Sequence, residues 1–333
     1  MKFGFIPIEG GAYYPEFLAE VQLGEALGFD SVWLEEHHGV KDHYWPSPLV
    51  ALAGIASQTE HLLLGTDVMV MPFYHPVRAA EDGAMLAVMT HGRFILGAAI
   101  GYKPDEFALY GAALERRGAR FEEAIRLIRQ LWSYDEVDFE GKYYQVHGLR
   151  IEPRPSAADR PPIWLGGWGE LSLARAATLG DAWIPGPTAD LQKLLDAQRI
   201  YLTKLGAANK DTATQPMPLT REVIIAESDE KARQLAEQHL LISYRDEYAS
   251  KQWKHPLIGA EDSTPADQLD AISRDRFLLG SPDTVIAQLR RFQTAFGVDH
   301  LICRLYFPGI PHEFILNELR LLSAEVMPAF GRM

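Results

Sequence analysis

Eight short apolar runs alternate with longer stretches of helical periodicity along the whole chain, and this alternation limits the folds open to it. Such alternation is typical of strand–helix units whose strands form a parallel sheet. Eight strands with about as many helices favour a closed (β/α)₈ TIM barrel over a doubly wound sheet, which usually has fewer strands. The expected strands are Lys2–Pro7, Ser31–Leu34, Leu62–Met71, Phe94–Ile100, Pro162–Leu165, Ala182–Pro185, Thr220–Ala226 and His300–Leu305.

The length of 333 residues exceeds the roughly 250 residues that a minimal barrel needs. No internal repeat or interdomain linker is visible, so the sequence predicts one domain over residues 1–333 with two insertions. An alternating stretch, Glu136–Val146, predicts a β-hairpin after the fourth unit. The segment from about Tyr244 to Asp275, between strands seven and eight, is either a lid that shapes the substrate site or a tolerated surface excursion.

Composition and charge exclude several classes of partner. The chain has 47% hydrophobic residues and a formal net charge of -13, so a nucleic acid or an anionic membrane would meet a repulsive field. Met1 and Lys2 lead directly into an apolar strand without a signal peptide, and no apolar run is long enough to span a membrane, which predicts a cytoplasmic protein. The only cysteine, Cys303, is expected to be a buried thiol.

The first candidate for chemistry is the run Glu36, His37, His38 at the carboxyl end of the second expected strand. Because side chains alternate along a strand, at most one of the two histidines points into the mouth of a barrel. A role as general base or hydrogen-bond donor and a role as a structural histidine are about equally supported. A metal-dependent hydrolase using His37, His38 and Asp67 is a weak alternative, since no third ligand has a familiar spacing.

Two further strand ends carry unusual residues. Asp67 interrupts the apolar run Leu62–Met71, and a buried carboxylate needs a partner or a function; the residues alone slightly favour a structural role. The fifth expected strand runs into Gly166, Gly167, Trp168 and Gly169, where backbone N–H groups could hold a phosphate at a helix start. Two observations weaken this phosphate-site interpretation. The negative charge of Glu170, the next residue, repels an anion, and glycines are also common in a tight turn without any ligand.

In combination these segments resemble the bacterial luciferase-like monooxygenase family. The resemblance covers about Lys2 to Pro187 and Leu279 to Phe307, most of the chain, and its pieces are specific as a set. The matching motifs are EHH, GTDVMVMP followed by HP, AED, HGRFILGAAIGYKPDEFALYG, PIWLGG and LGDAW.

The family resemblance implies a (β/α)₈ barrel, usually dimeric, that binds reduced flavin mononucleotide (FMN) or, in a sister branch, the deazaflavin coenzyme F420. It places His37 near the reactive edge of the flavin and Glu36 as the acidic residue before it, both as catalytic residues. It also places a non-prolyl cis peptide at Asp67-Val68 beneath the flavin ring. The other cofactor-binding positions that follow are Ala99, Gly101, Tyr102, Gly166, Gly167, Trp168 and Gly169.

One departure from the family affects phosphate binding. The luciferase α subunit has a reactive cysteine followed by an arginine where this chain has Ala99 and Ile100, then Gly101 and Tyr102. Light emission is therefore not implied, and the phosphate would depend on backbone groups at the glycine-rich turn from Gly166. These groups would have to outweigh the negative field of the whole chain.

The sequence thus predicts a monooxygenase that uses reduced FMN, supplied by a separate flavin reductase, and O₂ to oxidise a small hydrophobic molecule. No metal is expected. The first alternative is an F420-dependent oxidoreductase that transfers hydride without oxygen, and the second is a flavin-binding protein without activity. The metal-dependent hydrolase ranks last. The sequence does not identify the substrate.

Overall fold

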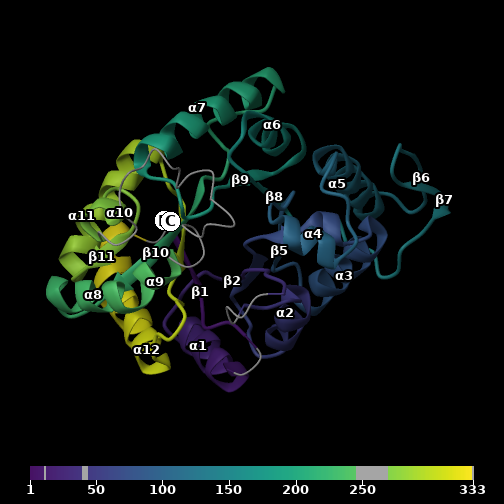
Figure 1. The fold of residues 1–333 in the computed structure, drawn as a ribbon. Helices are drawn as coiled ribbons and strands as arrows, with labels where there is room; N and C mark the ends of the chain where they lie inside the picture. Colours follow the sequence, from purple (N-terminus) through teal and green to yellow (C-terminus); the bar gives the residue numbers. More distant parts are fainter. Residues whose placement is uncertain (11–12, 40–43, 245–268, 332–333) are drawn as a thin grey trace. The chain divides into compact units, whose positions relative to one another are not determined.

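The computed structural model of the chain describes residues 1–10, 13–39, 44–244 and 269–331 (Figure 1). These residues form two compact units. Unit 1 comprises Met1–Trp33, Pro185–Arg199 and Pro216–Met333, and unit 2 comprises Leu34–Ile184 and Ile200–Gln215. The single domain over residues 1–333 stays a prediction. Across the described ranges, no helix has the length and apolar character needed to cross a membrane.

Unit 1 is built on parallel strands in the order β11, β10, β12, β1, β2. Helices α8 and α11 pack on β11, and α12 packs on β10 (Figure 1). The strands are β1 (Lys2–Ile6), β2 (Ser31–Leu34), β10 (Pro218–Ile225), β11 (Leu278–Gly280) and β12 (His300–Arg304). The helices are α1 (Tyr14–Ala26), α8 (Asp229–Leu235), α9 (Leu241–Ser243), α10 (Leu269–Ser273), α11 (Pro282–Phe296) and α12 (His312–Leu321), with π-helical turns at Ala236–Leu240 and Leu322–Val326 and a 3₁₀ turn at Met327–Phe330.

Unit 2 has a second set of parallel strands, in which β3 and β4 both pair with β5, followed by β8 and β9. The strands are β3 (Leu63–Thr66), β4 (Met69–Val70), β5 (Phe94–Ala99), β8 (Ile163–Gly166) and β9 (Ala182–Ile184). The helices are α2 (Pro48–Ala56), α3 (Pro76–Met89), α4 (Pro104–Leu109), α5 (Arg117–Ser133) and α6 (Glu170–Leu179), with a 3₁₀ turn at Met71–Phe73; α7 (Leu191–Ala207) contributes to both units.

The strands carry the core because their residues are buried on both faces. All eight residues of β10 are buried, as are all five of β12, which is the pattern of parallel strands covered by helices. The amphipathic helix α11 buries Val285, Leu289 and Phe292 and ends at Gly297, whose φ of 80° suits a left-handed cap. The predicted α/β fold with parallel strands is therefore confirmed.

One expected strand is wrong as a single element. The run Leu62–Met71 is split into β3 and β4, with Asp67 and Val68 between them. At the break, side chains form hydrogen bonds to backbone groups that a continuous strand would bond through its own backbone. The Thr66 hydroxyl bonds both the carbonyl and the N–H of Gly97, at 2.7 and 3.0 Å, and the Glu36 carboxylate accepts from the N–H of Val70 at 2.8 Å. The short strand β11 was not expected from the sequence.

The two predicted insertions differ in what the structure describes. Strands β6 (Val137–Glu140) and β7 (Gln145–Leu149) pair antiparallel at the position where the alternating pattern predicts a hairpin. The segment Tyr244–Asp275 lies largely outside the described residues, which omit 245–268. Cys303 is fully buried, as expected.

Candidate functional site

The candidate site residues all lie in unit 2, at or beyond the carboxyl ends of strands; Glu36 and His37 follow β2, whose first three residues belong to unit 1. The strands themselves are buried, but the residues that follow them are partly accessible. The accessible residues are His37 after β2, Asp67 and Val68 after β3, Ala99, Gly101 and Tyr102 at and after β5, and Gly166, Gly167, Trp168 and Gly169 at and after β8. Parallel sheets place binding sites at this edge.

Glu36 lies behind this edge and is fully buried. Its Oε1 accepts from the Tyr74 hydroxyl at 2.9 Å and contacts Nε2 of His38 at 2.5 Å, and its Oε2 accepts from the N–H of Val70 at 2.8 Å. Burial and the neighbouring carboxylate raise the pKa of the Tyr74 hydroxyl far above its usual range, so this hydroxyl donates. Glu36 thus connects the end of β2 to β4 through protein groups.

The two adjacent histidines face different surroundings. His38 is buried, with Nε2 on Glu36 and Nδ1 at 2.8 Å from the Tyr110 hydroxyl. His37 is half-buried, and its ring stacks on Tyr44 with 4.3 Å between centroids. The structure therefore buries His38 among protein contacts and leaves His37 partly accessible, with both residues beyond the end of β2.

Sequence reasoning missed Lys103 and Glu106, which complete the surroundings of His37. The Lys103 ammonium lies 3.0 Å from Nδ1 of His37 and 3.9 Å from Oε1 of Glu106. Glu106 is buried and accepts from the backbone N–H of His38 at 3.2 Å. Both residues lie shortly after the carboxyl end of β5, three positions apart. Since barrel enzymes build their sites after strand carboxyl ends, this position could have identified them in the sequence.

Three small or apolar positions form a continuous surface next to the break between β3 and β4. The Asp67-Val68 peptide bond is cis, as the resemblance implies. A Cβ placed on Gly166 would lie 3.5 Å from Cβ of Ala99 and 3.6 Å from Cγ1 of Val68, both ordinary van der Waals distances. We call this position beside Gly166, which a side-chain methyl could occupy and which the Ile184 carbonyl oxygen also borders at 3.5 Å, the cradle.

The chain after β5 is fixed beside this cradle. Gly101 has a φ of 67°, and a Cβ there would come within 2.6 Å of Val70. Its carbonyl accepts from Nε of Arg117 at 3.1 Å. The next residue, Tyr102, is 41% exposed. An arginine thus lies close to the segment from which the family arginine is missing, but in this structure it holds the backbone.

The glycine-rich turn after β8 leads into helix α6. Gly167 has a φ of 132°, open only to glycine, and its carbonyl accepts from the indole N–H of Trp183 at 2.9 Å. Trp168 packs edge-on against Trp183, and Gly169 is the N-cap of α6. The opposing charge of Glu170 is balanced by Lys204 at 2.8 Å, which lowers the pKa of that carboxyl.

The geometry does not favour a metal or an aromatic wall at Phe73. Within the described ranges no group of three His, Cys, Asp or Glu side chains could hold a metal ion. Phe73 packs between Phe107 and Tyr110, which is ordinary aromatic packing. Tyr44 and Tyr74 both contact candidate site residues, Tyr44 by stacking on His37 and Tyr74 by its hydrogen bond to Glu36.

Unit 1 contains a different group of buried charges, at the strands β10 and β12. Glu222 accepts from the Tyr244 hydroxyl at 2.7 Å and lies 3.8 Å from the Arg304 guanidinium. Burial raises the pKa of Glu222 to about 7 and lowers that of Arg221 to about 10. The sequence analysis did not select these residues.

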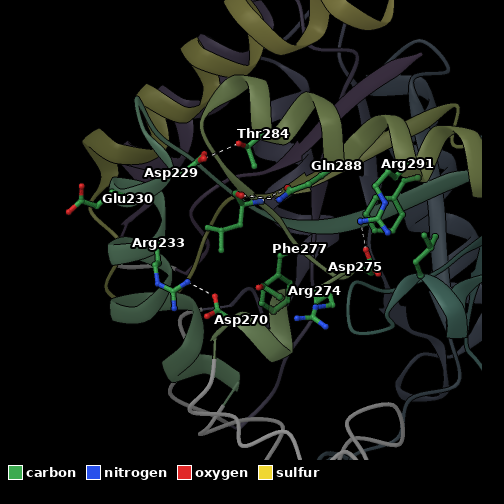
Figure 2. Close-up of a pocket in the computed structure, with 14 residues that line it drawn as sticks. Asp229, Glu230, Arg233, Asp270, Arg274, Asp275, Phe277, Thr284, Gln288 and Arg291 are labelled. Carbon is green, nitrogen blue, oxygen red and sulfur yellow. Dashed lines mark hydrogen bonds and ion pairs between the residues drawn. The ribbon is translucent and has the colours of Figure 1, made fainter.

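Unit 1 also has a cavity of about 540 Å³ between α8, α10, β11 and α11 (Figure 2). Its charged side chains bind one another: Arg233 pairs with Asp270, and Arg291 lies 2.6 Å from Asp275. The side-chain amide of Gln288 occupies the N–H and carbonyl of Leu279 on β11. None of the predicted site residues lines this cavity.

Comparison with known proteins gives consistent matches over the whole chain. A family model described as luciferase-like monooxygenase matches residues 3–300. An F420-dependent glucose-6-phosphate dehydrogenase from Amycolatopsis mediterranei is 28% identical over 94% of this chain and 94% of that protein. The oxygenase component of a flavin-dependent trigonelline monooxygenase from Acinetobacter baylyi is 25% identical over 96% of this chain and 90% of that protein. The crystal structure of the monooxygenase RslO1 from Streptomyces bottropensis has the same fold, with a TM-score of 0.85, 24% identity and coverage of 99% and 100%.

Proposed function

Because this chain belongs to the luciferase-like monooxygenase family, we propose that unit 2 binds reduced FMN and that the enzyme oxidises a small hydrophobic molecule with O₂. The observation that carries the proposal is that unit 2 holds both the partly accessible His37 and the cradle at Gly166, each at or beyond the carboxyl end of a strand. The (β/α)₈ barrel expected from the sequence agrees with this use of strand carboxyl ends.

The residues at the cradle fit a flat aromatic ring system. Val68, Ala99 and Gly166 present only methyl groups and backbone, and they lie at van der Waals distances from the space that a Gly166 side chain would take. Flat cofactors need such apolar surfaces with few polar contacts. These three residues would hold the ring, with Gly101 and Tyr102 beside it.

The phosphate would lie at the start of α6, beyond Gly167 and Trp168. A Cβ at Gly169 would meet no atom within 4 Å, so the helix start is open, and its N–H groups and dipole favour an anion. Lys204 balances the charge of Glu170. This ion pair reduces, at the helix start, the repulsion of an anion by Glu170 and by the net charge of -13.

The bound flavin supplies the oxidation chemistry, and the chain supplies orientation and exclusion of water. His37 is the side chain that we assign to contact the reacting atoms, because it is the accessible member of the histidine pair. Glu36, predicted as catalytic, acts in this proposal by holding β4 and His38 in place, because its side chain is fully buried and contacts the His38 ring and the N–H of Val70.

The alternative cofactor is F420, with hydride transfer in place of oxygen chemistry. It is favoured by the F420-dependent glucose-6-phosphate dehydrogenase of Amycolatopsis mediterranei, whereas the trigonelline monooxygenase component, which is flavin-dependent, favours a flavin. Both ring systems are flat and apolar on their faces, so the cradle accepts either. A flavin-binding protein without activity is less consistent with the accessible, hydrogen-bonded His37.

Two protein partners belong to the proposal. A separate flavin reductase would supply reduced FMN, in keeping with a relative that is the oxygenase component of its system. A homodimer would cover the apolar residues exposed on α2 and α3, because isolated apolar patches of this kind mark interfaces. These are Val50, Met85, Val88 and Met89, which are 40 to 72% exposed.

Anaerobic titration of the full-length chain with reduced FMN and with reduced F420, in parallel, tests the proposal. We expect tight binding of reduced FMN, seen as a change in tryptophan fluorescence, and weaker binding of F420. Tighter binding of F420 would instead support the alternative proposal, in which the enzyme transfers hydride and does not use O₂. Failure of both to bind would overturn the assignment of the site.

A further inference from the structure

We infer that Lys103 is a positioning residue that holds His37 in the tautomer with its proton on Nε2. This inference rests on the proposed function, in which His37 faces the bound cofactor. It assigns to His37 the chemistry of a hydrogen-bond donor and not that of a base.

The position of Lys103 is built into the chain after β5. Lys103 is the N-cap residue of α4, and Pro104 fixes the direction of the backbone after it. Its Nζ lies 3.0 Å from Nδ1 of His37, although 66 residues separate the two along the chain. The side chain is only 19% exposed, so this contact is shielded from water.

The contact has only one consistent assignment of protons when Lys103 is charged. An ammonium group has three donors and no acceptor, so Nδ1 of His37 must offer its lone pair. A neutral imidazole with its lone pair on Nδ1 carries the proton on Nε2. A doubly protonated ring would direct an N–H at the ammonium, with two donors and two positive charges 3.0 Å apart.

Nearby groups support the charged form of Lys103 and fix the ring. Oε1 of Glu106 lies 3.9 Å from Nζ and is held by the N–H of His38, so a carboxylate faces the ammonium. Tyr44 stacks on the imidazole at an interplanar angle of 24°, which sets the plane of the ring. With the plane and Nδ1 both set, the direction of the Nε2–H bond follows.

This arrangement has a functional consequence. A histidine that presents N–H can stabilise a carbonyl or an oxyanion as negative charge develops on it, but it cannot take a proton at that nitrogen. His37 would then polarise a substrate or cofactor oxygen.

Nitrogen NMR of the ¹⁵N-labelled, cofactor-free chain at neutral pH tests the inference. The His37 signals are identified by their loss in His37→Gln. We expect the wild type to favour the Nε2–H tautomer at least about tenfold, because charge-assisted hydrogen bonds contribute about 1.5–3 kcal/mol. Lys103→Met should lose this preference and Lys103→Arg should keep it. Lys142→Met, on the exposed hairpin turn, is the matched control and should behave as wild type.

Two results would overturn the inference: a wild-type His37 protonated on Nδ1, or the same tautomer ratio in Lys103→Met and wild type. Circular dichroism and urea unfolding of each variant confirm that it is folded. The same samples are titrated with reduced FMN and F420. A wild type that shows the Nε2–H tautomer but binds neither cofactor would refute the proposed function alone, whereas cofactor binding with an unchanged tautomer ratio in Lys103→Met would refute the inference alone.

Discussion

Both units contain buried carboxyl groups, but the two units treat them differently. In unit 2, Glu36 is contacted by a hydroxyl, a histidine and a backbone N–H. In unit 1, Glu20 has a backbone N–H at 2.6 Å and His312 at 2.7 Å, and burial raises its pKa to about 8. Among the described residues, Oε2 of Glu222 and of Glu318 has no hydrogen-bond partner, and burial raises the pKa of both groups.

The difference shows what burial alone does to an acid. Where few hydrogen-bond donors reach a buried carboxyl group, desolvation is the largest influence on its pKa, and the group keeps its proton to higher pH. Three donors around Glu36 instead suit a group that accepts only, and they connect it to the strand break and to the histidine pair. Unit 1 therefore uses its buried carboxyls as internal links, and unit 2 uses Glu36 to support an accessible site.

The largest expected effect separates the adjacent histidines. We expect His37→Ala to lower turnover by about 10²–10³-fold, in line with loss of a positioned hydrogen-bond donor, with little change in unfolding free energy or in cofactor affinity. His38→Ala should instead lower the urea midpoint, because it removes a buried ring from Glu36 and Tyr110. If both variants lost stability equally and His37→Ala kept full turnover, the division of roles would be wrong.

The next effect concerns Glu36 itself. Glu36→Gln puts an amide NH₂ among three donors, so at least one buried donor loses its acceptor, at a cost of about 1–3 kcal/mol each. We expect urea unfolding to show a loss of about 3 kcal/mol. Glu115→Gln, at an exposed position of the same unit, should change stability by less than about 0.5 kcal/mol. Equal stability of the two variants would contradict the network.

An effect that is visible only as a pH dependence tests the other side of the comparison. The pKa of Glu20 is about 8 in the folded chain and near 4.5 unfolded. Between these values the unfolded state has released the proton and the folded state has kept it, so rising pH favours unfolding and stability falls from about pH 4.5 to 8. Glu20→Gln should remove this slope, so its stability relative to wild type should rise with pH.

The control for this measurement is Glu227→Gln, at an exposed position of unit 1. Its unfolding free energy should follow wild type at every pH. A constant difference between Glu20→Gln and wild type from pH 5 to 8 would mean that Glu20 is ionised in the folded state, contrary to the effect of burial.

Much of the fold could be predicted because apolar runs report buried parallel strands. Seven of the eight expected strands have a counterpart at the same place in the chain, and the eighth, Leu62–Met71, is split. The apolar residues of this run could not show that the side chains of Thr66 and Glu36 would replace hydrogen bonds between strand backbones. Strand β11 has three residues and no alternation to detect. The segment 245–268 lies outside the described residues.

The site was predictable where position along a strand decides, and not where tertiary contacts decide. Alternation predicted only that at most one of the two histidines points into the mouth of a barrel, whereas the family resemblance selected His37 and implied the cis Asp67-Val68 peptide that the structure has. Lys103 and Lys204 were missed because their contacts, to His37 and Glu170, span 66 and 34 residues. Single-sequence patterns carry no record of such pairs.

The central claim, that the cradle in unit 2 holds the reduced cofactor, is tested most directly by filling it. The dissociation constant of the cofactor selected by the parallel titration is measured for Gly166→Val and for Gly206→Val, where a Cβ would meet no atom within 4 Å. We expect Gly166→Val to bind at least about tenfold more weakly, a loss of about 1.4 kcal/mol, and Gly206→Val to bind as wild type does. A folded Gly166→Val protein with wild-type affinity would contradict the claim.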